Sequence, residues 1–195
     1  MSLSYSHGEI PYITPISSHS DPKQYRSFVI PQNMLRVLLI SDVNSPSSAA
    51  AMTCGVGNLC DPHIFTSLDP TTRGEDGHYQ PLLGLTHLLE HMLFLGTTKY
   101  PNEGEYKYIV NKHGGTRNAS TSSETTTYQF EAPSTHFIDI LDRFAQFFIS
   151  PLLNKECLMR EMKVVNSEHN KNIVADSRRS HALLRMAIQP NHPCM

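Results

Sequence analysis

Two histidines and one glutamate lie within residues 87–91, HLLEH, and are the side chains of this sequence best suited to chemistry. In a helix, His87 and His91 would lie on one face, so both imidazoles could point at a common site. Neutral imidazoles suit Zn²⁺, and Glu90, on the adjoining edge of that face, could take a proton from a metal-bound water. The segment therefore predicts a zinc site with His87 and His91 as ligands and Glu90 as the general base.

A zinc site of this kind needs a third protein ligand and one position left for water. The order H-x-x-E-H is the inverse of the H-E-x-x-H pattern of many zinc peptidases. A helix expected over residues 155–172 offers Glu161 and Glu168, which are seven residues apart and so lie on nearly the same face. Spacing alone does not choose between them, and the alternative is that both are solvated glutamates on an exposed helix.

The elements that must position these residues alternate between strand and helix patterns. A run rich in leucine, valine and isoleucine predicts a strand at 34–41, and the segment AAAMTCGV that follows the next turn predicts another at 49–56. The Thr-rich segment 116–131 predicts two more. Helical spacing of apolar residues predicts helices over 85–95, 102–113, 134–150 and 155–172. Strands and helices in this order predict an α+β fold.

Residues 1–29 are polar and rich in proline and serine, so we expect an extended N-terminal arm there and one domain over residues 30–195. Within that domain, residues 63–83 form a long stretch with little periodicity. We interpret this stretch as a loop insertion, because long structureless loops in compact domains are usually functional or inserted.

Composition narrows the class of protein. The 195 residues carry 16 lysines and arginines against 18 acidic residues, a formal net charge of −2, which argues against a nucleic-acid partner. No run of 18 apolar residues is present, so a membrane span is not expected, and residues 1–29 lack the apolar segment of a secretory signal. Four cysteines without C-x-x-C spacing indicate reduced thiols, so we expect a cytoplasmic protein.

Several separate blocks resemble the N-terminal catalytic domain of insulysin/pitrilysin-type zinc metallopeptidases, the inverzincins of peptidase family M16. The blocks are GLTHLLEHMLFLGTTKYPNEGEY, HGGTRNASTSSETTTYQFE, LDRFAQFFISPLL and SEHNKN. The resemblance runs from about Met34 to the C-terminus. It implies an antiparallel-rich sheet packed on one side by helices, and a zinc endopeptidase that hydrolyses peptide bonds of peptides and small proteins.

The resemblance also implies roles for single residues. Glu168, in its Ser-Glu-His context, matches the family's third zinc ligand, and Glu161 matches a carboxylate that orients a ligand histidine. Asn118 and Ala119 match an edge-strand pair that binds the substrate backbone, and Phe94 matches an aromatic residue lining the site. One Zn²⁺ per chain is expected.

The family builds its protease from about four homologous domains in two halves that close around a chamber. The second half contributes an arginine and a tyrosine to the transition state. We therefore expect this chain to be a fragment that acts with the C-terminal half of the same full-length protein and is inactive or weakly active alone. The full-length protein could also form a homo-oligomer.

Two alternatives stand beside this interpretation. A mitochondrial processing peptidase-like subunit would share the zinc pattern, but the flanking blocks LDRFAQFFISPLL and SEHNKN and the lack of an Arg-rich amphipathic leader favour the insulysin type. A non-catalytic homologue could serve as an interaction module. The presence of His87, His91, Glu168 and Glu90 together argues against that loss of function.

Overall fold

The computed structural model describes residues 12–13, 16, 18–62 and 83–186. Nearly all of the insertion expected at 63–83, and part of the arm expected at 1–29, therefore lie outside the described residues. The chain divides into two compact units, Met1–Pro46 and Ser47–Met195.

The first unit is an antiparallel sheet of three strands in the order β1-β2-β3. These are β1 (Tyr12–Ile13), β2 (Gln24–Ile30) and β3 (Leu35–Ser41). Strand β3 confirms the prediction for residues 34–41. Strand β2 begins within the segment expected as an extended arm, and its register pairs Phe28 with Val37 of β3.

The second unit contains a sheet of three antiparallel strands in the order β4-β6-β5. They are β4 (Ser47–Cys54), β6 (Thr126–Pro133) and β5 (Thr116–Thr121), so strands were predicted correctly in all three places. Along the central strand β6, buried residues alternate with more exposed ones. This period of two means that one face of the sheet is covered and the other is open.

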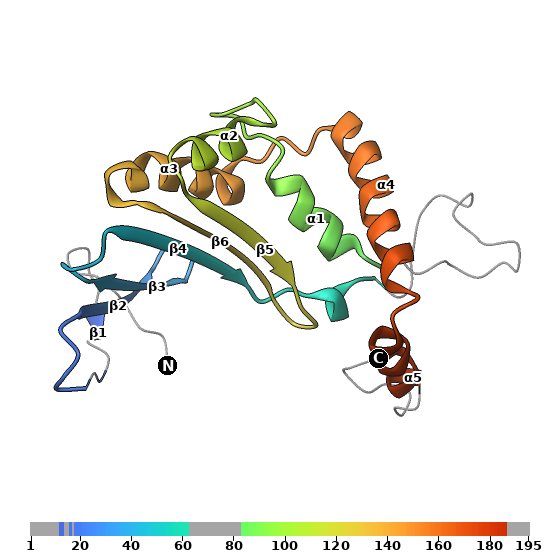
Figure 1. Cartoon of the computed structure of the whole chain (residues 1–195), viewed down its shortest axis with the longest axis horizontal. Helices are drawn as coiled ribbons and strands as arrows, with labels where there is room; N and C mark the ends of the chain where they lie inside the picture. The colour runs from blue at the N-terminus through green and yellow to red at the C-terminus, as the bar shows by residue number, and fades with distance from the viewer. Residues whose placement is uncertain (1–11, 14–15, 17, 63–82, 187–195) are drawn as a thin grey trace, which may run out of the picture. The chain divides into compact units, whose positions relative to one another are not determined.

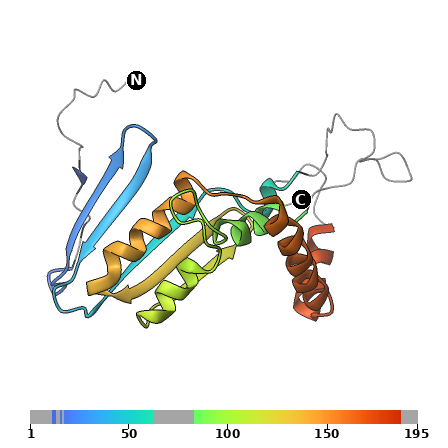
Figure 2. The ribbon, with the colours of Figure 1, turned by 90° about the horizontal axis from the view of Figure 1, so that it is seen from above.

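Helices cover that one face, as Figures 1 and 2 show for α2 (Glu105–Lys112) and α3 (Phe137–Ile149). Both helices contribute to one buried cluster with β6. Its buried members are Leu93, Tyr106, Val110, Tyr128, Phe130, Ala132, Ile140, Phe144 and Phe147. The antiparallel sheet packed on one side by helices confirms the predicted α+β fold.

The other helices of this unit are α1 (Leu85–Leu93), α4 (Lys155–Asn172) and α5 (Asp176–Met186), with short 3₁₀ turns η1 (Asn58–Cys60) and η3 (Ser134–His136). Helix α4 has the predicted bounds because the Asn154 side chain accepts a hydrogen bond from the Glu156 amide at 2.8 Å. Helix α2 begins three residues later than predicted, since residues 102–104 form a turn in which the Glu105 amide bonds the Asn102 carbonyl. Helix α5 was not predicted.

The start of α1 is held by a carboxylate from a distant part of the chain. Gly84 occupies the N-cap position with φ of 87° and has no side chain to cap the helix. Asp61, which is only 3% exposed, accepts hydrogen bonds from the Gly84 amide at 2.7 Å and the Thr86 amide at 2.8 Å. It also accepts one from the Thr86 hydroxyl at 2.6 Å. Asp61 thus satisfies helix amides that would otherwise have no partner and fixes where α1 begins.

We expect Asp61→Ala to lower the free energy of unfolding by about 1–3 kcal/mol, because it leaves buried donors without an acceptor. The measurement is urea denaturation of metal-free protein, followed by far-UV circular dichroism. Glu124→Ala, which removes a carboxylate from an exposed turn, is the matched control and should change stability by less than about 0.5 kcal/mol. Equal midpoints for the two variants would contradict this role of Asp61.

Candidate metal centre

Helix α1 presents its two histidines toward a common point. The Nε2 atoms of His87 and His91 lie 3.3 Å apart, and the two rings meet edge to face with centroids 4.9 Å apart. Their side chains are 36% and 21% exposed, so the pair lies at the border between core and solvent. This is the arrangement that the spacing of four residues on a helix predicts.

A third donor comes from α4, which lies beside α1 (Figure 1). The Glu168 Oε2 atom is 3.5 Å from Nε2 of His87 and 3.8 Å from Nε2 of His91. Tetrahedral zinc with bonds of about 2.0–2.1 Å holds its donors about 3.3–3.4 Å apart. The three donor atoms therefore have separations suited to one small divalent ion, and their chemistry, two imidazoles and a carboxylate, is a ligand set that zinc accepts.

Glu161 lies one layer behind this set. Its Oε2 atom is 3.2 Å from Nδ1 of His91, and its side chain is 13% exposed. A carboxylate at that nitrogen favours the tautomer in which Nδ1 carries the proton and Nε2 keeps a free lone pair. The structure thus separates the two glutamates that sequence spacing left equivalent.

Helix α4 is tied in this position by a chain of polar contacts. Arg160 places Nε 3.5 Å from Glu161 Oε1 and Nη2 2.7 Å from Glu103 Oε2. The Cys157 thiol donates to Glu103 Oε1 at 2.8 Å. The hydrogen bond from Cys157, and to a smaller extent the one from Arg160, holds the pKa of the Glu103 carboxyl below its usual range. Sequence analysis missed Glu103 and Arg160, because nothing in their spacing marks a contact 57 residues apart.

Glu90 is 8% exposed and points between α1 and the sheet. The Thr121 hydroxyl, from β5, donates to Glu90 Oε2 at 2.5 Å. Burial raises the pKa of the neighbouring Tyr128, and the Glu90 charge adds to that effect. Thr121 was also missed, although it follows Ala119 by two residues and so lies on the same face of the strand.

The residues expected to meet substrate lie on or near β5, which is an edge of the described sheet. Asn118 and Ala119 pair with β6 on one side only, opposite Gln129 and Tyr128. Phe94 directly follows α1 and packs in the aromatic core, with its ring centroid 5.3 Å from that of Phe147. The structure therefore shows Phe94 in a packing role, and its contact with substrate stays a prediction.

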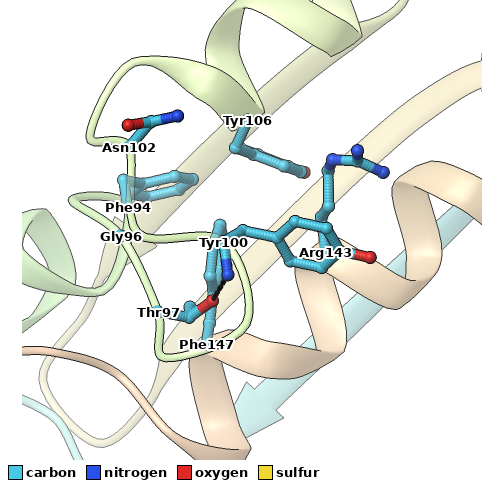
Figure 3. Close-up of a pocket in the computed structure, with 8 residues that line it drawn as sticks. All are labelled: Phe94, Gly96, Thr97, Tyr100, Asn102, Tyr106, Arg143 and Phe147. Atoms are coloured by element: carbon cyan, nitrogen blue, oxygen red, sulfur yellow. Dashed lines mark hydrogen bonds between the residues drawn. The ribbon is translucent and has the colours of Figure 1, made fainter.

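A small cavity lies behind Phe94, between the segment 96–102 and helices α2 and α3 (Figure 3). Its volume of about 10 Å³ holds about one water molecule. Tyr106 lines it, and among the described residues its buried hydroxyl has no hydrogen-bond partner. The cavity is far too small for an organic cofactor.

Among the residues that the structure describes, none of the helices has the length and apolar character of a membrane span.

Comparison with known proteins adds an independent line of evidence. Residues 78–191 match the family described as Insulinase (Peptidase family M16). The chain is 39% identical to human insulin-degrading enzyme over 194 residues, which are 97% of this chain and 17% of that protein. It is 41% identical to insulin-degrading enzyme-like 2 of Arabidopsis thaliana over 178 residues, 91% of this chain and 17% of that protein.

The crystal structure of pitrilysin is similar with a TM-score of 0.78 and 29% identity, covering 95% of this chain and 18% of that one. The chain thus spans less than a fifth of the length of these relatives. The sequence match covers the segment that carries HLLEH and Glu168, and the structural match covers almost the whole chain. The chain belongs to the insulinase family of peptidases, family M16.

Proposed function

We propose that this chain forms the zinc-binding catalytic domain of a metalloendopeptidase that hydrolyses peptide bonds in peptides and small proteins. The observation that carries the proposal is the convergence of His87, His91 and Glu168 at separations of 3.3–3.8 Å between donor atoms. These three residues would hold one Zn²⁺ per chain. The bound ion would supply Lewis-acid chemistry to a water and to the scissile carbonyl.

Glu90 moves the proton in this proposal. Its carboxylate accepts a proton from the attacking water and later passes one to the leaving amine. The Thr121 hydroxyl donates to Oε2 and so orients the carboxylate, which leaves Oε1 to receive the proton. Glu161 keeps the His91 ring in one orientation through Nδ1, and the Glu103–Arg160 pair supports Glu161.

The substrate would bind as an extended strand along the free edge of β5. Backbone groups at Asn118 and Ala119 can pair with such a strand, which selects substrates by their extended shape more than by side chain. Phe94 would border the site at the end of α1. The identity to insulin-degrading enzymes supports the insulysin type over the mitochondrial processing alternative.

The remaining proposals concern the whole protein. The chain covers 15–18% of the length of its relatives, so we propose that a C-terminal half of the same protein supplies an arginine and a tyrosine to the transition state. The described cysteines Cys54, Cys60 and Cys157 are free thiols, which supports a cytoplasmic location, although one Arabidopsis relative is named peroxisomal. Homo-oligomerisation of the full-length protein belongs to the same set of proposals.

We expect purified chain to carry one zinc per molecule after dialysis, measured by inductively coupled plasma mass spectrometry. His87→Ala and His91→Ala should abolish this stoichiometry because each removes a ligand. Glu90→Gln should retain it, because Glu90 acts on the proton and holds no metal. A wild-type chain without stoichiometric zinc would rule out the peptidase site and favour the interaction-module alternative.

We expect Glu161→Ala to weaken zinc binding about 10–100-fold without abolishing it, because it removes the carboxylate at Nδ1 of His91. The affinity is measured by competition with a chromophoric chelator. Glu156→Ala removes an exposed carboxylate from the first turn of the same helix and is the control that should bind zinc like wild type. Wild-type affinity in Glu161→Ala would contradict the orienting role.

We expect peptide cleavage by the zinc-loaded chain to rise when the separately purified remainder of the full-length protein is added. The same mixture with Glu90→Gln should be slower by about 10²–10⁴-fold, the usual contribution of a general base. Cleavage of a quenched fluorescent peptide is the measurement. If adding the rest of the protein does not raise cleavage while zinc stays bound, the proposal that a C-terminal half completes the active site is wrong. The proposed metal site is not affected by that result.

A further inference from the structure

A second, larger pocket lies beside β5, between the end of α1 and the start of α2. Its volume is about 260 Å³, enough for one amino-acid side chain, and it is open on one side. Phe94 and Tyr106 give it an aromatic wall, and the charged residues that line it are Glu103, Lys107 and Arg117. Phe94 and Glu103 already have places in the proposed site, but Lys107 and Arg117 have no role in the proposed hydrolysis.

The two cations of the pocket have no partner of opposite charge in the described part of the chain. Neither Arg117 nor Lys107 makes an ion pair within 4 Å there. The Arg117 Nε atom is buried and has no hydrogen-bond partner among these residues. The charge of Arg117 lies close enough to Tyr106 to oppose the rise in pKa that burial gives its phenol. A buried N–H donor without an acceptor is costly, so the Nε–H group of Arg117 favours a ligand that supplies one.

The one carboxylate that lines the pocket does not meet this need. Both oxygens of Glu103 are occupied, Oε1 by the Cys157 thiol at 2.8 Å and Oε2 by Arg160 at 2.7 Å. Arg160 balances the charge of Glu103 from α4, outside the pocket. The pocket therefore keeps the positive charge of Arg117 and Lys107.

The pocket lies along the strand where substrate is proposed to bind. Arg117 immediately precedes Asn118, and the alternation of β5 puts it on the same face as Ala119 and Thr121. The Thr121 hydroxyl donates to Glu90, so the end of β5 at Thr121 lies next to the proposed base. Thr121 lies four positions after Arg117, which is about 13 Å along a strand, or roughly four substrate residues.

We propose that this pocket binds a carboxylate of the peptide substrate about four residues from the scissile bond. The proposal rests on the proposed function, because it takes the substrate to add to β5 as a strand. The Arg117 guanidinium provides paired donors for the carboxylate, and Lys107 adds a point charge at the mouth. The carboxylate can be an acidic side chain or the peptide's own C-terminus.

The test uses the zinc-loaded Glu90→Gln chain, so that bound peptides are not cut, and three matched acetylated peptides. The first has one Glu and an amidated C-terminus, the second replaces that Glu by Gln, and the third has the Gln and a free C-terminal carboxylate. A series of variants of the first peptide, with the Glu moved to each position in turn, locates the contact. Binding is measured by calorimetry, together with the Arg Nε–H resonances in NMR spectra of labelled protein.

We expect at least one carboxylate peptide to bind ten-fold or more tightly than the neutral peptide and to shift the Arg117 Nε–H resonance. Tighter binding of the first identifies a side-chain carboxylate, and tighter binding of the third identifies the C-terminus. Arg117→Gln should remove the preference, Arg117→Lys should keep part of it, and Lys107→Gln should reduce it. Lys163→Gln, which removes an exposed charge from α4, should leave it unchanged.

Equal binding of all three peptides, or no measurable binding of any, overturns the proposal, as does a preference that survives in Arg117→Gln. Zinc content is measured on the same samples. Bound zinc without a carboxylate preference means that only the pocket assignment fails. A chain that binds no zinc means that the proposed peptidase function fails, whatever the peptides do.

Discussion

The packing of α4 against α1 is the constraint on which the candidate metal centre depends. Two donors lie on α1 and the third, Glu168, lies on α4, so the set forms only while these helices keep their positions. Little apolar burial holds α4, since Cys157 is its only buried residue within the described chain. Polar contacts provide the rest, from Glu103 to Arg160 and from Glu161 to His91. A metal bound by both helices would therefore stabilise this part of the fold as well as serve the chemistry.

The candidate metal ligands and the proposed base lie between two packed supports. On one side, Leu93 at the end of α1 packs into the aromatic core between β6 and the helices α2 and α3. On the other side, β5 supplies Thr121 to Glu90 and an open edge to an extended peptide. The proposed base is thus oriented by the same strand that would orient the substrate. A displacement of β5 would disturb the proton transfer and the binding of the peptide together.

Local signals in the sequence predicted most of the elements and part of the site. The HLLEH spacing correctly predicted that two imidazoles share one helix face. Asn154 was predicted to cap the helix that begins at residue 155, and its side chain does so. Seven residues bring Glu161 and Glu168 back to the same face, so spacing could not tell their roles apart. Only the three-dimensional crossing of α1 and α4 shows that one approaches Nδ1 of His91 and the other Nε2. Asp61, Thr121 and Arg160 act across long separations in the chain, which no local pattern reveals.

The bonds of Asp61 have a consequence for how this fold can vary among related chains. They join residue 61 directly to residues 84 and 86 and so fix the start of α1. In proteins generally, each doubling of the length of a flexible loop costs only about 0.6 kcal/mol in closure entropy. With Asp61 in place, a change of chain length between these points should therefore preserve the direction of α1, which carries His87 and His91.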